Sequence, residues 1–201
     1  RERFLAELDL LHERGWRDNV FVVDDNFIGD RGRCKDLLRG IIDWRRRTGS
    51  RMTLMTEASV NMAEDPELLQ LMVDAGFKKV FLGLETPSAE SLKECHKVQN
   101  LRGDLASAVH TIQAAGLAVM GGFIVGFDSD GPDIFQRQFE FIQKAGVVTA
   151  MVGLLQALPK LPCQVIHGDA NPENIILDGE RVAGFVDFGD ACFNPRICEV
   201  A

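Results

Sequence analysis

Residues 1–157 repeat one pattern of polar and apolar positions. A helical stretch ends in glycine, and a short apolar run follows it. A glycine just past a helix end supplies the left-handed backbone conformation that other residues resist. The pattern therefore predicts strands after successive glycines. The predicted strands are Asn19–Asp24, Met52–Glu57, Lys78–Leu84, Ala118–Val125 and Val148–Leu155.

The segments between these strands are amphipathic, with apolar residues spaced as on one face of a helix. Three apolar stripes are clear: Leu37, Leu38, Ile41, Ile42 and Trp44; Leu68, Leu69, Leu71 and Met72; and Phe135, Phe139 and Ile142. Asp65-Pro66 precedes the second stripe as a cap and first-turn proline, and Pro132-Asp133 opens the third. The strands are nearly continuous apolar runs, which predicts parallel strands covered on both faces.

Strands that alternate with helices indicate an α/β fold. The spacing suits the units of a barrel or a doubly wound sheet, but five units are too few for a closed eight-stranded barrel. We therefore predict a partial (β/α) barrel of about five parallel strands. A β-hairpin segment follows it near the C-terminus.

Composition narrows the class of protein. The chain has 201 residues and a net charge of −8, and its one basic cluster, Arg45–Arg47, falls at a predicted helix end. Nucleic acid is therefore not an expected partner, because phosphate binding needs clustered cations. No apolar run has membrane-spanning length and nothing resembles a signal peptide, so no membrane partner is expected either. Because the first residue is Arg1 and Leu5–Leu11 already reads as helix, we expect a piece of a longer protein.

The cysteines indicate a reducing compartment. There are five of them, and none forms a CxxC pair. An odd number of widely spaced cysteines favours free thiols in the cytoplasm over a disulfide framework. A structural zinc site is not expected.

Polar residues directly follow the predicted strands. Asp24, Asp25 and Asn26 end the first, Glu57 the second and Glu85 the third. In parallel α/β sheets, chemistry takes place at the carboxyl ends of the strands. Each residue could instead be a loop starter, since such side chains also cap helices. Their coincidence at several strands supports a shared polar pocket.

These strand ends also carry a family resemblance. Val-Asp-Asp-Asn-Phe (23–27), Thr-Glu-Ala-Ser (56–59), Gly-Leu-Glu-Thr-Pro (83–87) and Gly-Gly-Phe-Ile-Val-Gly-Phe (121–127) resemble the barrel of radical S-adenosylmethionine (radical SAM) proteins. The resemblance covers about residues 19–159. It is strongest to the class often found with a cobalamin-binding domain.

The resemblance implies S-adenosylmethionine and a [4Fe–4S] cluster as cofactors. It places Asp24, Asp25 and Asn26 at the methionine end of S-adenosylmethionine, and Glu57 and Glu85 towards the ribose and the reaction cavity. The residues implied beside the adenine are Gly122, Ile124 and Gly126. Glycines let a strand approach a flat ring closely. Tight helix–sheet packing is the alternative explanation for Gly121, Gly122 and Gly126.

One departure from the family bears on activity. The family binds its cluster through three cysteines at Cx3Cx2C spacing, because thiolates hold iron–sulfur clusters. None of the five cysteines in the sequence has that spacing. We therefore expect the chain by itself to be inactive in radical chemistry.

A second signature follows Pro159. It comprises His167-Gly-Asp169, then Asn174, then Asp187-Phe-Gly189. In phosphoryl transfer an aspartate such as Asp169 accepts the proton of the substrate hydroxyl, and oxygen ligands such as Asn174 and Asp187 bind magnesium. A hairpin of 174–177 with 181–187 about Asp178-Gly179 would set the two metal ligands side by side. A plain hairpin with a coincidental Asp-Gly turn is the alternative.

The second signature, from about Leu161 to Ala201, resembles the aminoglycoside phosphotransferase and choline kinase-like family. The resemblance implies Mg-ATP as cofactor. The glycine-rich loop and strand lysine that hold a nucleotide in kinases do not precede the signature in the sequence. The ATP-binding lobe of the family is therefore not represented.

We interpret the chain as a chimera of a partial barrel, residues 1–159, and a kinase-like fragment, residues 160–201. We expect the apolar segments 165–166, 175–177 and 182–186 to pack against the barrel. Three functions follow as hypotheses: an S-adenosylmethionine-binding barrel, a small-molecule phosphotransferase, and a joined chain without catalysis. The expected partners are small-molecule ligands.

Overall fold

The computed structural model describes residues 1–101 and 103–155, and the short strands 163–166, 175–178, 181–185 and 192–195. The chain divides into two compact units, Arg1–Leu155 and Gln156–Ala201, and each is described by itself. In the described part of the chain, no helix is long and apolar enough to cross a membrane.

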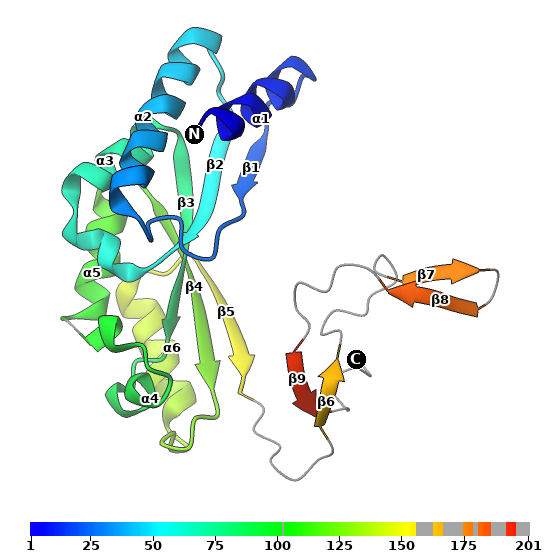
Figure 1. Cartoon of the computed structure of the whole chain (residues 1–201). Coiled ribbons are helices and arrows are strands. Elements are labelled where there is room, and N and C mark those ends of the chain that lie inside the picture. Colours follow the sequence, from blue (N-terminus) through cyan, green and yellow to red (C-terminus); the bar gives the residue numbers. More distant parts are fainter. Residues whose placement is uncertain (102, 156–162, 167–174, 179–180, 186–191, 196–201) are drawn as a thin grey trace. The chain divides into compact units, whose positions relative to one another are not determined.

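The N-terminal unit alternates helices and strands (Figure 1). The elements are α1 (Glu2–Glu13), β1 (Asn19–Val22), α2 (Arg31–Thr48), β2 (Thr53–Ala58), the 3-10 helix η1 (Val60–Glu64), α3 (Pro66–Asp74), β3 (Phe77–Glu85), α4 (Ala89–Glu94), the 3-10 helix η2 (Val98–Leu101), α5 (Leu105–Ala114), β4 (Ala118–Val125), α6 (Ile134–Ala145) and β5 (Thr149–Leu154). The five strands form one sheet in the order β1-β2-β3-β4-β5, all parallel. The sheet curls into a half-barrel, which confirms the predicted α/β class and partial barrel.

The predicted helix ends are confirmed in their backbone geometry. The glycines that follow α1, α2, α3, α5 and α6 all have positive φ: Gly15, Gly49, Gly76, Gly116 and Gly146. Asp65 caps α3 by accepting a hydrogen bond from the backbone N–H of Leu68, and Pro66 occupies the first turn. The arginines 45–47 lie in the last turn of α2, where the helix dipole favours cations.

The core lies between the sheet and its helices. On β2 and β4, and on β3 from Val80 onward, every second residue is fully or almost fully buried. The apolar residues of this face pack in one core with the apolar stripes of α2, α3 and α5. Trp44, Phe77 and Phe123 are the largest side chains in this layer. Burying that apolar surface is the main driving force for folding of the unit.

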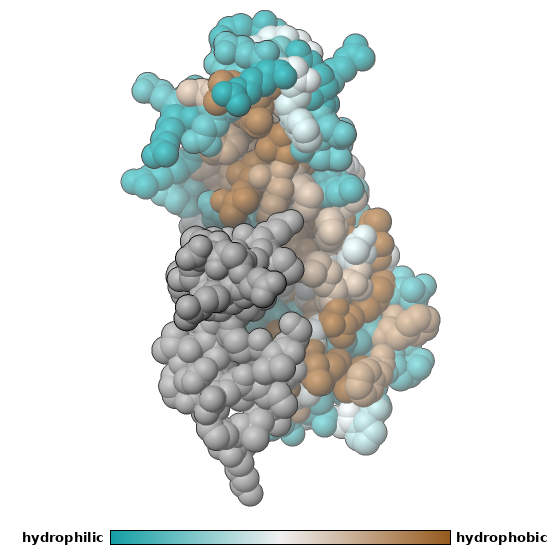
Figure 2. Space-filling view, turned by 90° about the vertical axis from the view of Figure 1, so that its right-hand side faces the viewer, coloured by the Kyte–Doolittle hydropathy of each residue, from teal (hydrophilic) through white to brown (hydrophobic). Residues whose placement is uncertain are grey.

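The opposite face of the sheet is more open, which corrects the expectation of strands covered on both faces. All six residues of β5 are exposed, and Phe21 and Val23 at the other edge are 46% and 83% exposed. Figure 2 views the molecule from the side that β5 occupies in Figure 1 and shows apolar surface there. Continuous apolar runs therefore did not indicate two covered faces in β1 and β5.

The third predicted stripe is corrected in part. Ile142 is partly buried and packs against the core, whereas Phe135 and Phe139 are 66% and 58% exposed. The buried residues of α6 are Ile134, Gln138 and Ala145. α6 leads into β5, which is the edge strand of the sheet. One side of α6 lies beside α5, and within residues 1–155 no further helix follows α6 along the sheet.

The C-terminal unit contains two antiparallel pairs. β6 (Cys163–Ile166) pairs with β9 (Cys192–Pro195), and β7 (Ile175–Asp178) pairs with β8 (Arg181–Phe185). The β7–β8 pair confirms the predicted hairpin segment. Packing of these segments against the half-barrel stays a prediction.

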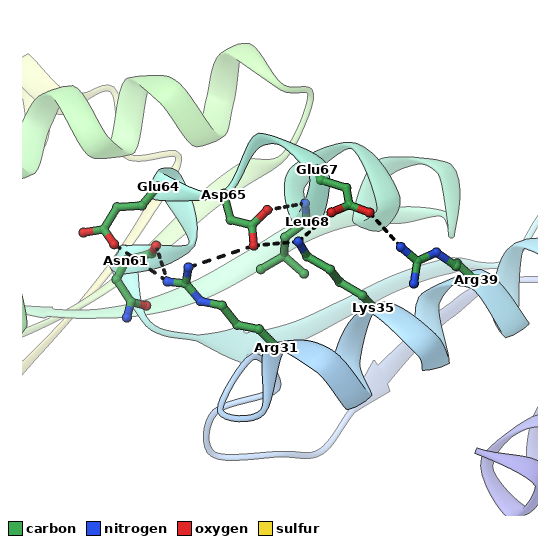
Figure 3. Close-up of polar contacts among 8 residues, drawn as sticks. All are labelled: Arg31, Lys35, Arg39, Asn61, Glu64, Asp65, Glu67 and Leu68. Carbon is green, nitrogen blue, oxygen red and sulfur yellow. Dashed lines mark hydrogen bonds and ion pairs between the residues drawn. The ribbon is translucent and has the colours of Figure 1, made fainter.

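An ion-pair network joins α2 to the start of α3 (Figure 3). Lys35 reaches two carboxylates, Asp65 at 2.9 Å and Glu67 at 2.8 Å. Arg31 donates a hydrogen bond to the backbone oxygen of Asn61 at 3.0 Å and faces Asp65 at 3.9 Å. The hydrogen bond from Lys35 holds the pKa of Asp65 below its ordinary value. Asp65 is thus both helix cap and counter-ion.

Replacing Asp65 separates these two roles. Asp65→Ala removes cap and charge and is expected to lower the free energy of unfolding by about 1 kcal/mol or more. Asp65→Asn keeps a capping oxygen and is expected to cost less. Urea unfolding followed by the fluorescence of Trp16 and Trp44, the two tryptophans of the chain, measures both.

The same variants test the charge. The lowered pKa means that the ionised form stabilises the fold above the ordinary pKa of 3.8, and this contribution is lost as the pH falls through the folded-state value. The difference between wild type and Asp65→Asn should therefore shrink at acid pH. The exposed Glu64, 3.8 Å from Arg31, is the control, since Glu64→Gln should change little. Equal losses in all three variants would contradict this role of Asp65.

Candidate functional site

A cavity of about 280 Å³ opens at the carboxyl ends of β2 and β3 and the loop after β1. Asp25, Asn26, Glu57 and Glu85 all line it, although 60 residues separate the first from the last. Parallel strands bring these positions to one edge of the sheet. The cavity is lined by Asp25, Asn26, Glu57, Ala58, Ser59, Phe81, Gly83, Glu85, Lys97 and Gln99.

The loop after β1 is fixed by short polar contacts. The Asp24 carboxylate accepts a hydrogen bond from the backbone N–H of Asn26 at 2.9 Å, and Ser59 donates to the Asn26 side-chain oxygen at 3.2 Å. The backbone N–H of Phe27 donates to the Glu57 carbonyl at 3.0 Å. Asp24 itself lines a different cavity, beside Asp30 and Cys34. The Asp24 carboxylate thus holds the loop, Asn26 lines both cavities, and Asp25 faces the shared one. The expected place of Asp24 at the methionine end of S-adenosylmethionine stays a prediction.

Glu85 has an unusual backbone conformation. Its φ is +64°, and the next backbone N–H, that of Thr86, donates to the Leu84 carbonyl at 2.8 Å to close a tight γ-turn. The register between β3 and β4 shifts at this point. The buried Asn100 donates to the carbonyls of Gly83 and Leu84 at 3.0 and 3.1 Å. A residue with a β-carbon is disfavoured at such a φ, and strain of this kind gathers at functional sites.

The Glu85 carboxylate lies over the strand and meets a lysine. Its Oε1 is 2.9 Å from Lys97 Nζ, and the Glu85 side chain is 13% exposed against 37% for Lys97. A β-carbon on Gly83 would lie 2.7 Å from that Oε1 and 3.1 Å from the ammonium. Gly83 thus leaves the space that the ion pair occupies. Lys97 was missed by sequence reasoning, since it sits in an irregular segment between α4 and η2 that has no periodic pattern.

The residues expected beside the adenine lie on or just after β4. A β-carbon on Gly122 would lie 2.8 Å from the Phe81 ring, and one on Gly121 would meet Phe123 and Leu84. Gly121 therefore fits the alternative of tight packing, and Gly122 lies against a ring of the cavity wall. The Ile124 carbonyl accepts from Gln138 at 2.7 Å, and Gly126 has a φ of +101°.

Two carboxylates hold the loop after β4. Asp130 accepts hydrogen bonds from the backbone N–H groups of Gly126 and Phe127 at 2.9 and 3.1 Å. Glu94 of α4 accepts from those of Asp128 and Ser129, at 2.9 and 3.2 Å. The hydrogen bond from the Asp128 backbone lowers the pKa of Glu94. Both carboxylates therefore fix the position of the glycine-containing strand end.

The described residues do not suit an iron–sulfur cluster. No group of three or more His, Cys, Asp or Glu side chains among them could hold a metal ion. Cys34 is buried on α2, and burial raises the pKa of its thiol to about 12, so it is protonated at neutral pH. Cys95, at the end of α4, is also a free thiol.

The predicted residues of the second signature lie outside the described residues. They are the catalytic Asp169 and the magnesium ligands Asn174 and Asp187. Their roles stay predictions. The described strands β7 and β8 lie between the two metal-ligand positions in the chain.

Comparisons with known proteins identify relatives of both parts. Residues 128–201 match the phosphotransferase enzyme family. The chain is 38% identical over 182 residues to the hopanoid C-2 methylase of Rhodopseudomonas palustris, covering 87% of this chain and 34% of that protein. It is 45% identical over 157 residues to an uncharacterized methyltransferase of Synechocystis, covering 78% and 29%.

Solved structures share the fold. The radical S-adenosylmethionine methyltransferase TsrM from Kitasatospora setae superposes with a TM-score of 0.63 at 18% identity, over 75% of this chain and 30% of that one. The cobalamin-dependent S-adenosylmethionine radical enzyme OxsB gives 0.58 at 18% identity, over 76% and 23%. The chain thus resembles both radical SAM enzymes and the phosphotransferase enzyme family. Both resemblances predicted from the sequence are thus confirmed, and the chain spans about a third of the length of the curated relatives it matches.

The strain at Glu85 can be measured with two variants. Glu85→Gly and Glu85→Ala both remove the ion pair with Lys97, but only glycine tolerates a φ of +64° without a β-carbon penalty. We expect the glycine variant to unfold at a free energy about 1 kcal/mol higher than the alanine variant. Urea unfolding by tryptophan fluorescence gives the difference. An alanine variant as stable as the glycine variant would argue against backbone strain at this position.

Proposed function

We propose that residues 1–155 bind S-adenosylmethionine in the cavity at the carboxyl ends of β2 and β3. The observation that carries the proposal is the meeting of Asp25, Glu57 and Glu85 in one cavity of a half-barrel of the radical SAM type. Carboxylates can accept hydrogen bonds from an amino group and from ribose hydroxyls. Gly122 and Ile124 of β4, and Gly126 directly after it, would lie beside the adenine.

The charge of the cavity supports this ligand. Three acidic side chains and one lysine line it. S-adenosylmethionine carries a sulfonium and an ammonium group, and an acidic site favours both. Methyltransferase activity is named for curated relatives of which this chain spans about a third, and we do not propose it for this chain by itself.

Radical chemistry in this chain is not part of the proposal. The described residues offer no set of three thiolates, and the sequence has no Cx3Cx2C spacing. The chain thus keeps the means to bind and orient the ligand, while cleavage would require a cluster that its described residues do not fit. We accordingly propose an inactive binding barrel, located in the cytoplasm, where its free thiols stay reduced.

Calorimetric titration of the full chain with S-adenosylmethionine tests the binding. Glu57→Gln and Glu85→Gln should each weaken it by about tenfold, because each loses a charged acceptor in the cavity. The same change at Glu140, exposed on α6, is the matched control and should have no effect. S-adenosylhomocysteine, which lacks the sulfonium charge, should bind more weakly. No heat at millimolar S-adenosylmethionine would overturn the proposal.

The match of residues 128–201 to phosphotransferases supports a second candidate function. The C-terminal unit would then bind Mg-ATP, with Asp169 as base and Asn174 and Asp187 as magnesium ligands. ATP turnover is expected to be lost in Asp169→Asn. Turnover that is indifferent to this change would exclude the phosphotransferase, and absence of both activities would leave a non-catalytic chimera.

A further inference from the structure

Lys97 is a second functional group of the cavity that the family motifs do not contain. Among the described residues, Lys97 is the one cationic residue in the lining of the cavity, and Asp25, Glu57 and Glu85 are its acidic residues. The Lys97 ammonium lies 2.9 Å from Glu85 Oε1, over the space that Gly83 leaves free. The ion pair therefore sits inside the proposed ligand site.

Backbone geometry sets the positions of both partners of this ion pair. Glu85 has a φ of +64°, which a residue with a β-carbon resists, and strain of this kind gathers at functional sites. His96 directly precedes Lys97, and its φ of +58° belongs to the cap that ends α4, in which the backbone N–H of Lys97 donates to the Leu92 carbonyl at 3.0 Å. The backbone strain therefore lies at Glu85, and the end of α4 places Lys97 against it.

Exposure shows which partner a ligand meets first. The Lys97 side chain is 37% exposed and that of Glu85 is 13% exposed. Lys97 therefore covers Glu85, and a hydroxyl group can reach the Glu85 carboxylate once the ammonium has an alternative partner. An anionic group on the ligand would supply that partner.

We propose that Lys97 recognises the carboxylate of the methionine part of S-adenosylmethionine and releases Glu85 to the ligand as it does so. The inference rests on the proposed function. The complementarity is one of sign: the acidic groups of the cavity suit the ammonium and sulfonium of the ligand, and the lysine suits its carboxylate. Lys97 then contributes specificity for a ligand with an intact amino-acid end.

The test compares two ligands that differ in that group alone. S-adenosylmethionine and its decarboxylated analogue are titrated into the full chain and into Lys97→Met, which keeps the length of the side chain and loses its charge. The measured quantity is the ratio of the two dissociation constants in each protein, because the ratio cancels effects of the variant that both ligands share. We expect the preference for the carboxylated ligand to fall by about tenfold in Lys97→Met.

Two further variants complete the design. Lys97→Arg should keep much of the preference, and Lys93→Met, on the exposed side of α4, should leave it unchanged. Trp16 and Trp44 fluorescence during urea unfolding checks that Lys97→Met is folded. If both ligands weaken equally in Lys97→Met, Lys97 only positions Glu85 and the inference is wrong while the proposed function stands. If neither ligand binds the wild-type chain, the proposed function and the inference fall together.

Discussion

Helices α2, α3 and α5 bury one face of the parallel sheet, and this burial determines which side chains of the N-terminal unit face the candidate site. Side chains alternate along a strand, so once Val80, Leu82 and Leu84 turn towards the helices, Phe81, Gly83 and Glu85 must turn the other way. The register of β2, β3 and β4 then brings the carboxyl ends of the strands together. The candidate site is thus a consequence of core packing on the opposite face.

The site departs from regular sheet geometry at one point. The γ-turn at Glu85 and the register shift beside it lift the carboxylate over Gly83, where Lys97 meets it. At the irregular strand end, the side chain of Asn100 donates a hydrogen bond to the carbonyls of Gly83 and Leu84. Buried carbonyls without partners would be costly, so this asparagine stabilises the strained turn. In the loop after β4, the carboxylates of Glu94 and Asp130 likewise accept hydrogen bonds from backbone N–H groups.

The two units resemble two kinds of enzyme. Carboxylates and a glycine line the cavity of the half-barrel, and the second unit lies within the match to the phosphotransferase enzyme family. The described part of the barrel has no cysteine set for a cluster. Ligand binding and catalysis are separate properties of such folds, because residues at the strand ends bind and orient the ligand and the cofactor supplies the reactivity.

Local patterns in the sequence determined most of the secondary structure of residues 1–155. Glycine spacing and helix stripes were enough to predict the five strands, the parallel sheet and the cap at Asp65, since these depend on neighbours in the chain. The strand-end motifs predicted that Asp24, Asp25, Asn26, Glu57 and Glu85 would share a pocket, and all of them except Asp24 line one cavity. Only the tertiary structure assigned Asp24 to shaping the loop, exposed Phe135 and Phe139, and brought Lys97 onto Glu85. The last two outcomes depend on contacts between segments that are far apart in the chain, and a pattern of neighbouring residues does not contain those contacts.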